Sequence, residues 1–350
     1  MNPYVLSLLI SALGLGTALT FSSSHWLLAW MGLEVNTLAI IPLMTQKHSP
    51  RSVEAAAKYF LTQAAAAATI MFASATNAWL TGTWDILHLS HPFCATVAFM
   101  ALALKLGLAP VHFWLPEVIQ GVTLTTGLIL STWQKLAPFA LILQVAPSVH
   151  HALVVSVGLA STFIGGWGGI NQTQVRKLLA YSSVAHLGWM IIISQFSSSL
   201  SLLALSLYIV MTTSAFLTMK AGAASSLNTL AVSWSKTPTL IALASLTLLS
   251  LAGLPPLSGF MPKWLILQEM TKQGLPVLAT LAALSALLSL FFYLRISYAM
   301  ALTVSPNTVG ASLSWRSSGN HSTLLLASST VMALGLLPLT PAFLSLYSLG

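Results

Sequence analysis

Charged residues are scarce in this chain of 350 residues. Only 5% of the residues are charged and just 5 are aspartate or glutamate, whereas 56% are hydrophobic. Soluble domains typically carry about 25% charged residues. A soluble domain of this size could not cover its surface with so few charges, so the composition indicates a membrane protein.

Sequence signatures of redox cofactors and metals are also lacking. Cys94 is the single cysteine, so no internal disulfide can form, and we interpret it as a small apolar packing residue. The sequence has no C-x-x-C, G-x-G-x-x-G or P-loop motif and no iron–sulfur ligand set. We therefore expect no redox cofactor and no metal in this chain. The net charge of +8 is not gathered on a soluble face, which argues against nucleic-acid binding.

Long apolar runs recur from end to end, separated by short polar gaps. A hydrocarbon core about 30 Å thick needs about 20 apolar residues per helical span. The runs predict one all-α polytopic membrane domain over residues 1–350, with about eleven transmembrane helices. The predicted spans cover residues 3–21, 25–44, 54–80, 92–116, 122–144, 151–170, 177–196, 200–219, 237–269, 276–299 and 322–347. We expect no targeting peptide, because Met1-Asn2-Pro3 leads directly into the first run.

Basic residues are shared unequally between the two sides that these spans define. Lys272 lies on the far side, and the side of the N-terminus holds nine basic residues: Lys47, Arg51, Lys58, Arg176, Lys177, Lys220, Lys236, Arg295 and Arg316. Because inner loops collect lysine and arginine, the N-terminus is predicted on the cytoplasmic or equivalent side. The odd number of spans then places the C-terminus on the far side.

The fourth and ninth predicted spans share a pattern of glycine and proline. Gly107-Leu108-Ala109-Pro110 is followed after five residues by Pro116-Glu117, and Gly253-Leu254-Pro255-Pro256 is followed after five by Pro262-Lys263. Glycine and proline break helices, and membrane proteins tolerate such breaks where the gap faces protein or water. The predicted helix-breaking residues are Gly107, Pro110, Gly253, Pro255 and Pro256. Since the spans lie five apart and cross in opposite directions, the pattern favours an inverted repeat over ordinary proline kinks.

Four charged residues stand inside the apolar runs: Glu34, Lys105, Lys135 and Lys263. Placing an ionisable group near the bilayer centre costs at least about 2.5 kcal/mol, and such groups usually mark ion or proton pathways. Burial favours the neutral form of an amine, whereas a nearby carboxylate favours the ammonium. Moving Glu34 toward or away from Lys105 would therefore load or release a proton. The alternatives are a structural ion pair and, for Lys263, a lysine that snorkels to the headgroups.

Two histidines are weaker candidates for proton transfer. His112 lies inside the break of the fourth span, and His186 lies midway along the seventh. Histidine exchanges protons near neutral pH, so both are accessory candidates. For each of them, a hydrogen-bonded packing role is the interpretation that the sequence favours.

Five segments together resemble the subunit 2 family of mitochondrial NADH–ubiquinone oxidoreductase, respiratory complex I, in its vertebrate form. They are Met1-Asn2-Pro3, WMGLEVN at 30–36, KLGLAPVHFWLPE at 105–117, GINQTQVRKLLAYSS at 169–183 and GLPPLSGFMPKW at 253–264. The resemblance covers the whole chain, and the motifs are specific only in combination.

The resemblance implies an antiporter-like subunit with two inverted five-helix repeats, each with a broken helix. The repeats would span residues 1–146 and 150–300, and a C-terminal helix would span 320–348. By motif match, Glu34 and Lys105 form a coupled pair, Lys135 is the central lysine and Lys263 is the exit-side lysine. The general antiporter-like pattern has fourteen spans, so this chain would lack three at its N-terminus.

The same resemblance implies that electron transfer from NADH to ubiquinone in other subunits drives proton translocation here. The location would be the mitochondrial inner membrane, with the N-terminus in the matrix and the C-terminus in the intermembrane space. Partners would be other membrane-arm subunits, including antiporter-like ones, and phospholipids, cardiolipin among them. NAD, FMN, iron–sulfur clusters and ubiquinone would belong to the whole complex. A stand-alone cation/proton antiporter of related fold and a structural scaffold remain open alternatives on the residues alone.

Overall fold

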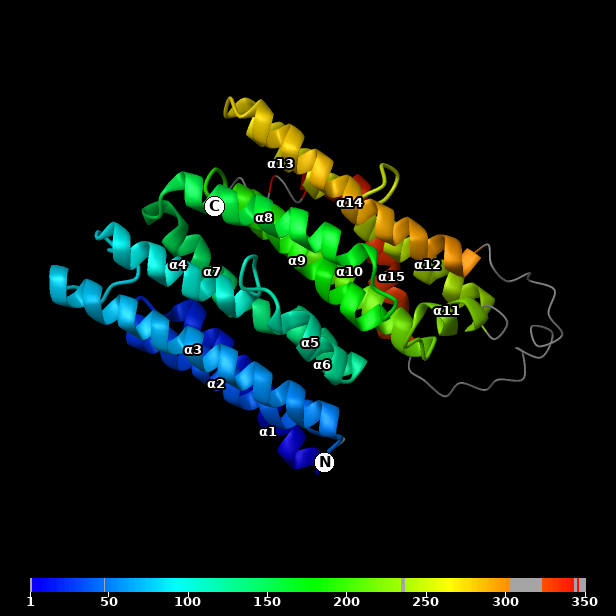
Figure 1. Cartoon of the computed structure of the whole chain (residues 1–350), viewed down its shortest axis with the longest axis horizontal. Helices are drawn as coiled ribbons and strands as arrows, with labels where there is room; N and C mark the ends of the chain where they lie inside the picture. The colour runs from blue at the N-terminus through cyan, green and yellow to red at the C-terminus, as the bar shows by residue number, and fades with distance from the viewer. Residues whose placement is uncertain (1, 47, 234–236, 302–322, 343–344, 346–350) are drawn as a thin grey trace. The chain divides into compact units, whose positions relative to one another are not determined.

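The computed structural model describes every residue except 1, 47, 234–236, 302–322, 343–344 and 346–350. Lys47, Lys236 and Arg316 therefore lie outside the described residues, as do parts of the predicted C-terminal helix. The chain separates into two compact units, residues 1–160 and 161–350. Within the described residues, the regular structure of both units is helical apart from two isolated bridges, His25–Asp85 and Gln174–Ser226 (Figure 1).

The first unit is built from helices joined by short connections. In chain order they are α1 (Pro3–Ser22), α2 (Trp26–Met44), α3 (Pro50–Thr81), α4 (Pro92–Leu106), α5 (Trp114–Gly121), α6 (Leu124–Ser131) and α7 (Trp133–Val145), followed by the 3₁₀ turn η1 (Ala146–Ser148). Helix α8 (His151–Ile170) begins in this unit and ends in the second. Asn2 and Ser49 begin α1 and α3, each accepting a backbone N–H on its side-chain oxygen before a proline.

Helices of the second unit follow the same plan. They are α9 (Val175–Ser194), α10 (Ser198–Ala221), α11 (Leu227–Ser233), α12 (Pro238–Ala252), α13 (Phe260–Lys272), α14 (Pro276–Ala301) and α15 (Leu324–Gly335), with the 3₁₀ turn η3 (Leu337–Leu339) after α15. Most predicted spans agree with a helix to within a few residues. Helix α11 was not predicted, because its seven residues (LNTLAVS) contain no long apolar run.

Seven helical stretches of the described residues are long and apolar enough to cross a membrane: α1, α2, α6 to η1, α8, α9, α10 and α14. Helices α4, α12 and α15 are apolar but shorter. This pattern is that of a polytopic membrane protein. Many large apolar side chains lie exposed on the helices, such as Leu8 and Ile10 on α1, as expected where a helix faces lipid.

Close helix packing fixes the position of α2 in the first unit. Gly16 of α1 and Gly32 of α2 face each other, and a Cβ atom on Gly16 would lie 2.9 Å from the Gly32 carbonyl oxygen. The absence of side chains lets the two backbones approach. Further along, Ile40 and Met44 of α2 pack with Tyr59 of α3 in a buried apolar cluster. Helix α2 is therefore held along its length, and Glu34 lies between these two contacts.

A left-handed glycine follows the last residue of α4 and of α12. Gly107 has φ +79° and Gly253 has φ +84°. The Gly107 N–H donates to the carbonyls of Ala103 and Leu104, and the Gly253 N–H donates to those of Leu249 and Ser250. Glycine tolerates this conformation without steric cost, and its N–H closes the last helical turn. The helix resumes at Trp114 after the first break and at Phe260 after the second.

Candidate functional site

An acid–lysine pair lies between α2 and α4 in the first unit. The Lys105 Nζ atom lies 3.9 Å from Oε1 of Glu34, and the Lys105 side chain is only 1% exposed. The other Glu34 carboxylate oxygen accepts a hydrogen bond of 3.1 Å from the Thr37 hydroxyl. Nζ makes no hydrogen bond to any residue that the structure describes. At this separation the pair is an ion contact rather than a hydrogen bond, so a small movement would make or break it.

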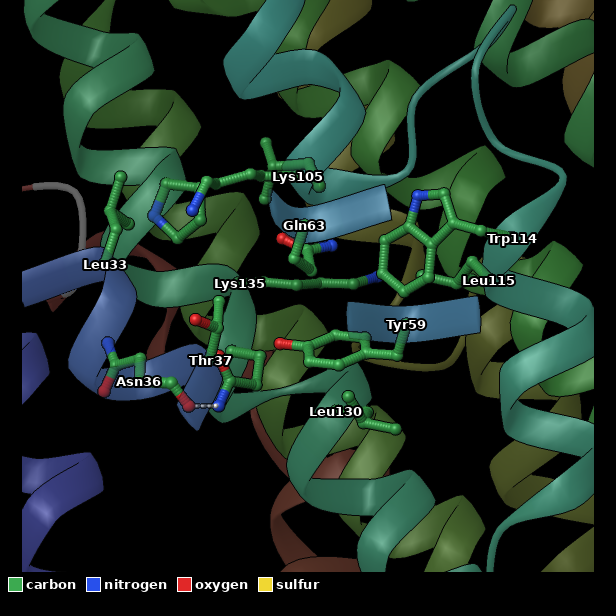
Figure 2. A pocket seen from close by; sticks show the side chains of 13 residues that line it. Leu33, Asn36, Thr37, Tyr59, Gln63, Lys105, Trp114, Leu115, Leu130 and Lys135 are labelled. Atoms are coloured by element: carbon green, nitrogen blue, oxygen red, sulfur yellow. Dashed lines mark hydrogen bonds between the residues drawn. The ribbon is translucent and has the colours of Figure 1, made fainter. Parts of the chain in front are cut away.

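Lys105 shares a cavity with Lys135 of α7. The cavity offers about 20 Å³ to the centre of a water-sized sphere. Its polar lining residues are Asn36, Thr37, Tyr59, Gln63, Lys105, Gln134 and Lys135. Figure 2 shows the Lys135 side chain extending across the cavity toward Trp114. Two buried amines thus line one small polar space, and the Glu34 carboxylate contacts one of them, Lys105.

Trp114 closes the first helix break beside this cavity. Its indole N–H donates to the Leu104 carbonyl oxygen at 2.9 Å. Its ring packs edge-on against Tyr59, with centroids 5.8 Å apart and planes at 61°. Leu104 is one of the last residues of α4, whose carbonyls lack helical partners. Trp114 therefore ties the start of α5 to the end of α4 and fixes the turn that carries Lys105.

Lys263 lies at the second helix break, in the second unit. Its Nζ atom donates to the Ala252 carbonyl oxygen at 2.7 Å. A Cβ atom on Gly253 would lie 3.0 Å from both Cδ and Nζ of Lys263, so the side chain lies directly over this glycine. The ammonium group thus binds at the carboxyl end of α12, where the helix dipole favours positive charge.

His186 and Lys263 line one cavity of the second unit. It offers about 10 Å³ to the centre of a water-sized sphere, and Trp189 and Met190 are among its other lining residues. The His186 ring lies 5.7 Å from the ring of Tyr208. His112 lies in the first unit, inside the break, where it is 2% exposed and packs on Phe113 with ring centroids 4.4 Å apart. The two histidines therefore belong to different units.

Gln63, Tyr59 and Trp114 are cavity residues that sequence reasoning missed. A search restricted to charged side chains passes over amides, phenols and indoles. Gln63 carried a signal nonetheless, because it precedes five consecutive alanines, Ala64–Ala68, within an apolar stretch of α3. In the part of the chain that the structure describes, no three histidine, cysteine, aspartate or glutamate side chains gather as a metal site would require.

Family models match nearly the whole chain. Residues 23–289 match the model described as "NADH:quinone oxidoreductase/Mrp antiporter, TM". Residues 290–344 match the model described as "NADH dehydrogenase subunit 2 C-terminus". The chain belongs to the NADH:quinone oxidoreductase/Mrp antiporter family. Membership in this family and the match to the subunit 2 model confirm the resemblance that the five sequence segments indicated.

Curated relatives in this family are similar over their full length. The chain is 68% identical to proteins named NADH-ubiquinone oxidoreductase chain 2 from Oncorhynchus mykiss and from Salmo salar, covering 100% of both chains in each case. It is 64% identical to the protein of the same name from Gadus morhua, again over 100% of both chains.

Solved structures share the fold. Respiratory complex I from Thermus thermophilus contains a chain with TM-score 0.82 and 29% identity, and the match covers 97% of this chain and 79% of that one. The Mrp complex from Dietzia sp. DQ12-45-1b contains a chain with TM-score 0.81 and 18% identity, covering 97% and 76%. At that identity the second match indicates the fold alone.

Proposed function

We propose that this chain translocates protons through a relay of Glu34, Lys105, Lys135 and Lys263. As a full-length relative of NADH-ubiquinone oxidoreductase chain 2, it is an antiporter-like membrane subunit of that proton-translocating enzyme. The electron-transfer reaction takes place elsewhere in the complex and supplies the driving force. This chain supplies a path for protons through the membrane arm.

One observation carries the relay in the first unit. The Glu34 carboxylate and the Lys105 ammonium meet at 3.9 Å next to a cavity that Lys135 also lines. While the Glu34 carboxylate contacts Lys105, it favours the protonated amine. When the carboxylate moves away, the amine releases its proton toward Lys135. Glu34 therefore acts as the gate, Lys105 as the loaded site and Lys135 as the acceptor.

Lys263 serves as the exit-side site in the second unit. Its amine lies at the end of α12 and beside His186, so that the histidine is an accessory carrier for the same proton. His112 is the corresponding accessory candidate in the first unit. The positions of Lys263 and His112 at the two helix breaks support these roles, because backbone carbonyls at such a break can serve as proton-site partners.

The proposal includes a topology. About eleven spans form two inverted five-helix repeats, 1–146 and 150–300, followed by the C-terminal helix at 320–348. The left-handed glycines at both breaks support a common ancestry of the repeats. The excess of basic residues on one side supports an N-terminus in the matrix and a C-terminus in the intermembrane space.

The chain is a multi-pass protein of the mitochondrial inner membrane, as its family membership and apolar helices indicate. We propose that neighbouring antiporter-like subunits and phospholipids, cardiolipin among them, contact the exposed apolar helices. We also propose that NAD, FMN, iron–sulfur clusters and ubiquinone bind in other subunits, and that this chain contributes ionisable side chains and water-sized cavities.

Lys105→Met tests the relay in the assembled oxidoreductase. Methionine keeps the apolar stem and removes the amine. Lys272→Met is the matched control, because Lys272 is 63% exposed and makes only a 4.0 Å contact with Glu269. We expect both complexes to assemble and oxidise NADH, with protons translocated per NADH lowered only for Lys105→Met. Full proton translocation by the Lys105→Met complex would falsify the role of this lysine.

The stand-alone antiporter makes a different prediction. Its fold is shared, as the match to the Mrp complex indicates. In that case the chain would migrate apart from NADH-oxidising activity in a mildly solubilised native gel, and proton uptake by the isolated chain would depend on an added cation. Co-migration with NADH oxidation, without such cation dependence, supports the respiratory subunit.

A further inference from the structure

Gln63 of α3 is a buried polar side chain that the proposed relay does not use. The residue is 4% exposed, and its Nε2 atom makes no hydrogen bond to any residue that the structure describes. It lines the cavity of Lys105 and Lys135. In Figure 2 the Gln63 amide lies between the side chains of the two lysines. An amide donor without a partner among the described residues thus belongs to the same cavity as the two lysines.

A buried amide without a partner is unfavourable, so a partner is expected where space allows one. A water molecule requires at least about 10–15 Å³ of space for its centre and two to four polar partners. The cavity provides about 20 Å³, which is enough for one water. Gln63 and the two lysines provide the partners.

Two other polar groups of the cavity are already engaged, whereas the Asn36 amide, like the Gln63 Nε2 atom, makes no hydrogen bond to any residue that the structure describes. The Gln134 amide donates to the Asn36 carbonyl oxygen at 3.1 Å. The Thr37 hydroxyl donates to the Glu34 carbonyl at 2.8 Å and approaches its carboxylate at 3.1 Å. The Gln63 Nε2 donor is therefore available to a water molecule in this cavity.

We propose that Gln63 holds a water molecule between Lys105 and Lys135 and orients it for proton transfer between them. This inference rests on the proposed relay and adds a positioning residue to it. The Gln63 N–H occupies one lone pair of the water oxygen, and the Lys105 ammonium donates to the other. Both water O–H bonds then point away from these donors, and one of them is directed at the Lys135 amine.

The transfer step is balanced within this arrangement. The Lys105 ammonium gives a proton to the water oxygen while the water gives one of its own protons to the neutral Lys135 amine. Lys105 becomes neutral, Lys135 becomes an ammonium, and the water remains neutral. The Gln63 carboxamide gains and loses no proton, because its task is to hold the water oxygen in place.

Gln63→Leu tests the proposal in the assembled oxidoreductase. Leucine is similar in size but lacks the donor. Gln273→Leu is the matched control, because Gln273 lies exposed after α13 and bonds only to Glu269 among side chains in the described structure. We expect the Gln273→Leu complex to oxidise NADH and to translocate protons as the wild type does. The Gln63→Leu complex should differ from it in proton transfer. Proton transfer through this chain should slow by about tenfold or more, within the up to ~100-fold cost of misplacing reacting groups.

Two further measurements distinguish the water-positioning role of Gln63 from a merely structural one. In a Lys105→Met background, Gln63→Leu should add no further loss of proton translocation, whereas a packing defect would add to it. A high-resolution density map of the complex should contain a water within hydrogen-bonding distance of Gln63 Nε2, and the Gln63→Leu map should lack it. Wild-type translocation by Gln63→Leu, or a map with no water there, overturns the proposal.

Gln63→Asn decides the case if the leucine variant does not assemble. Asparagine keeps the amide but withdraws it by one methylene, so translocation should fall, and an unchanged value would refute the role. Failure of this inference is distinguishable from failure of the relay. If Lys105→Met lowers translocation and Gln63→Leu does not, only the bridging water is wrong. If Lys105→Met has no effect, the relay itself is wrong.

Discussion

Gly107→Ala should weaken the first helix break and lower proton translocation together. Gly107 has φ +79°, a conformation that costs a residue with a Cβ atom about 1–2 kcal/mol. The added Cβ would also lie 3.1 Å from Leu115 Cδ1 and 3.5 Å from the Trp114 ring. Leu115 is buried, so crowding adds about 1–3 kcal/mol. The combined cost is about 2–5 kcal/mol, and it falls two residues from Lys105.

Alanine variants of two other glycines separate the conformational cost from the cost of crowding. Gly82 has φ +74° and nothing within 4 Å of an added Cβ, so Gly82→Ala carries the conformational cost without crowding. Gly14, inside α1, has nothing within 4 Å, so Gly14→Ala carries neither and gains up to about 1 kcal/mol of helix propensity. The expected order of destabilisation is Gly107→Ala, then Gly82→Ala, then Gly14→Ala.

The assay is the temperature at which each assembled complex loses half its NADH–ubiquinone activity, measured with the number of protons translocated per NADH. We expect Gly107→Ala to lower both quantities, and Gly82→Ala to lower only the first. If Gly107→Ala behaved like Gly14→Ala in both measurements, the break would not need the left-handed glycine, and its link to the position of Lys105 would be refuted.

Three further predictions follow from contacts at the site and in one loop. Trp114→Phe removes the indole donor to the Leu104 carbonyl and should lower thermal stability by about 1 kcal/mol, seen in the same heat-inactivation assay; unchanged stability would show that the bond is dispensable. Glu34→Gln leaves Lys105 without its anion and should lower protons translocated per NADH, and a wild-type ratio would contradict the gating role. In the loop after α3, the His88 ring at 2.7 Å lowers the pKa of the Asp85 carboxyl below its usual range. A lowered folded-state pKa stabilises the loop above the usual pKa of about 3.9, and this stabilisation is lost as the pH falls through the lower folded value. The protection of the Ile86 amide against hydrogen exchange should therefore fall between neutral pH and pH below about 4. This fall should be larger in the wild type than in Asp85→Asn, and an equal fall in both would count against the pair.

The two breaks could be predicted from sequence because glycine and proline act locally. A left-handed glycine ends a helix by its own conformational freedom, so Gly107 and Gly253 identify the positions without knowledge of the surroundings. The side chains that close the breaks could not be predicted in this way. Trp114 and Lys263 reach the carbonyls of Leu104 and Ala252 only once the chain has turned back, and no sequence spacing specifies that.

Charge identified the relay candidates, but it could not pair them. The cost of burying charge makes Glu34, Lys105 and Lys135 conspicuous in apolar sequence. Their meeting depends on how α2, α4 and α7 pack together, which a sequence pattern does not measure. Gln63 stands out in the sequence beside five alanines, but only the structure shows that its amide donor lies in the lysine cavity with no partner among the described residues.

The hydrogen bond between Lys263 and the Ala252 carbonyl gives this protein a built-in spectroscopic reporter. The stretching frequency of a backbone carbonyl depends on whether its donor is an ammonium or a neutral amine. A single ¹³C label at the Ala252 carbonyl would therefore move one infrared band away from those of the other peptide groups. Its shift during turnover would record each change in the charge of Lys263, without a dye, an added side chain or any alteration of the lysine.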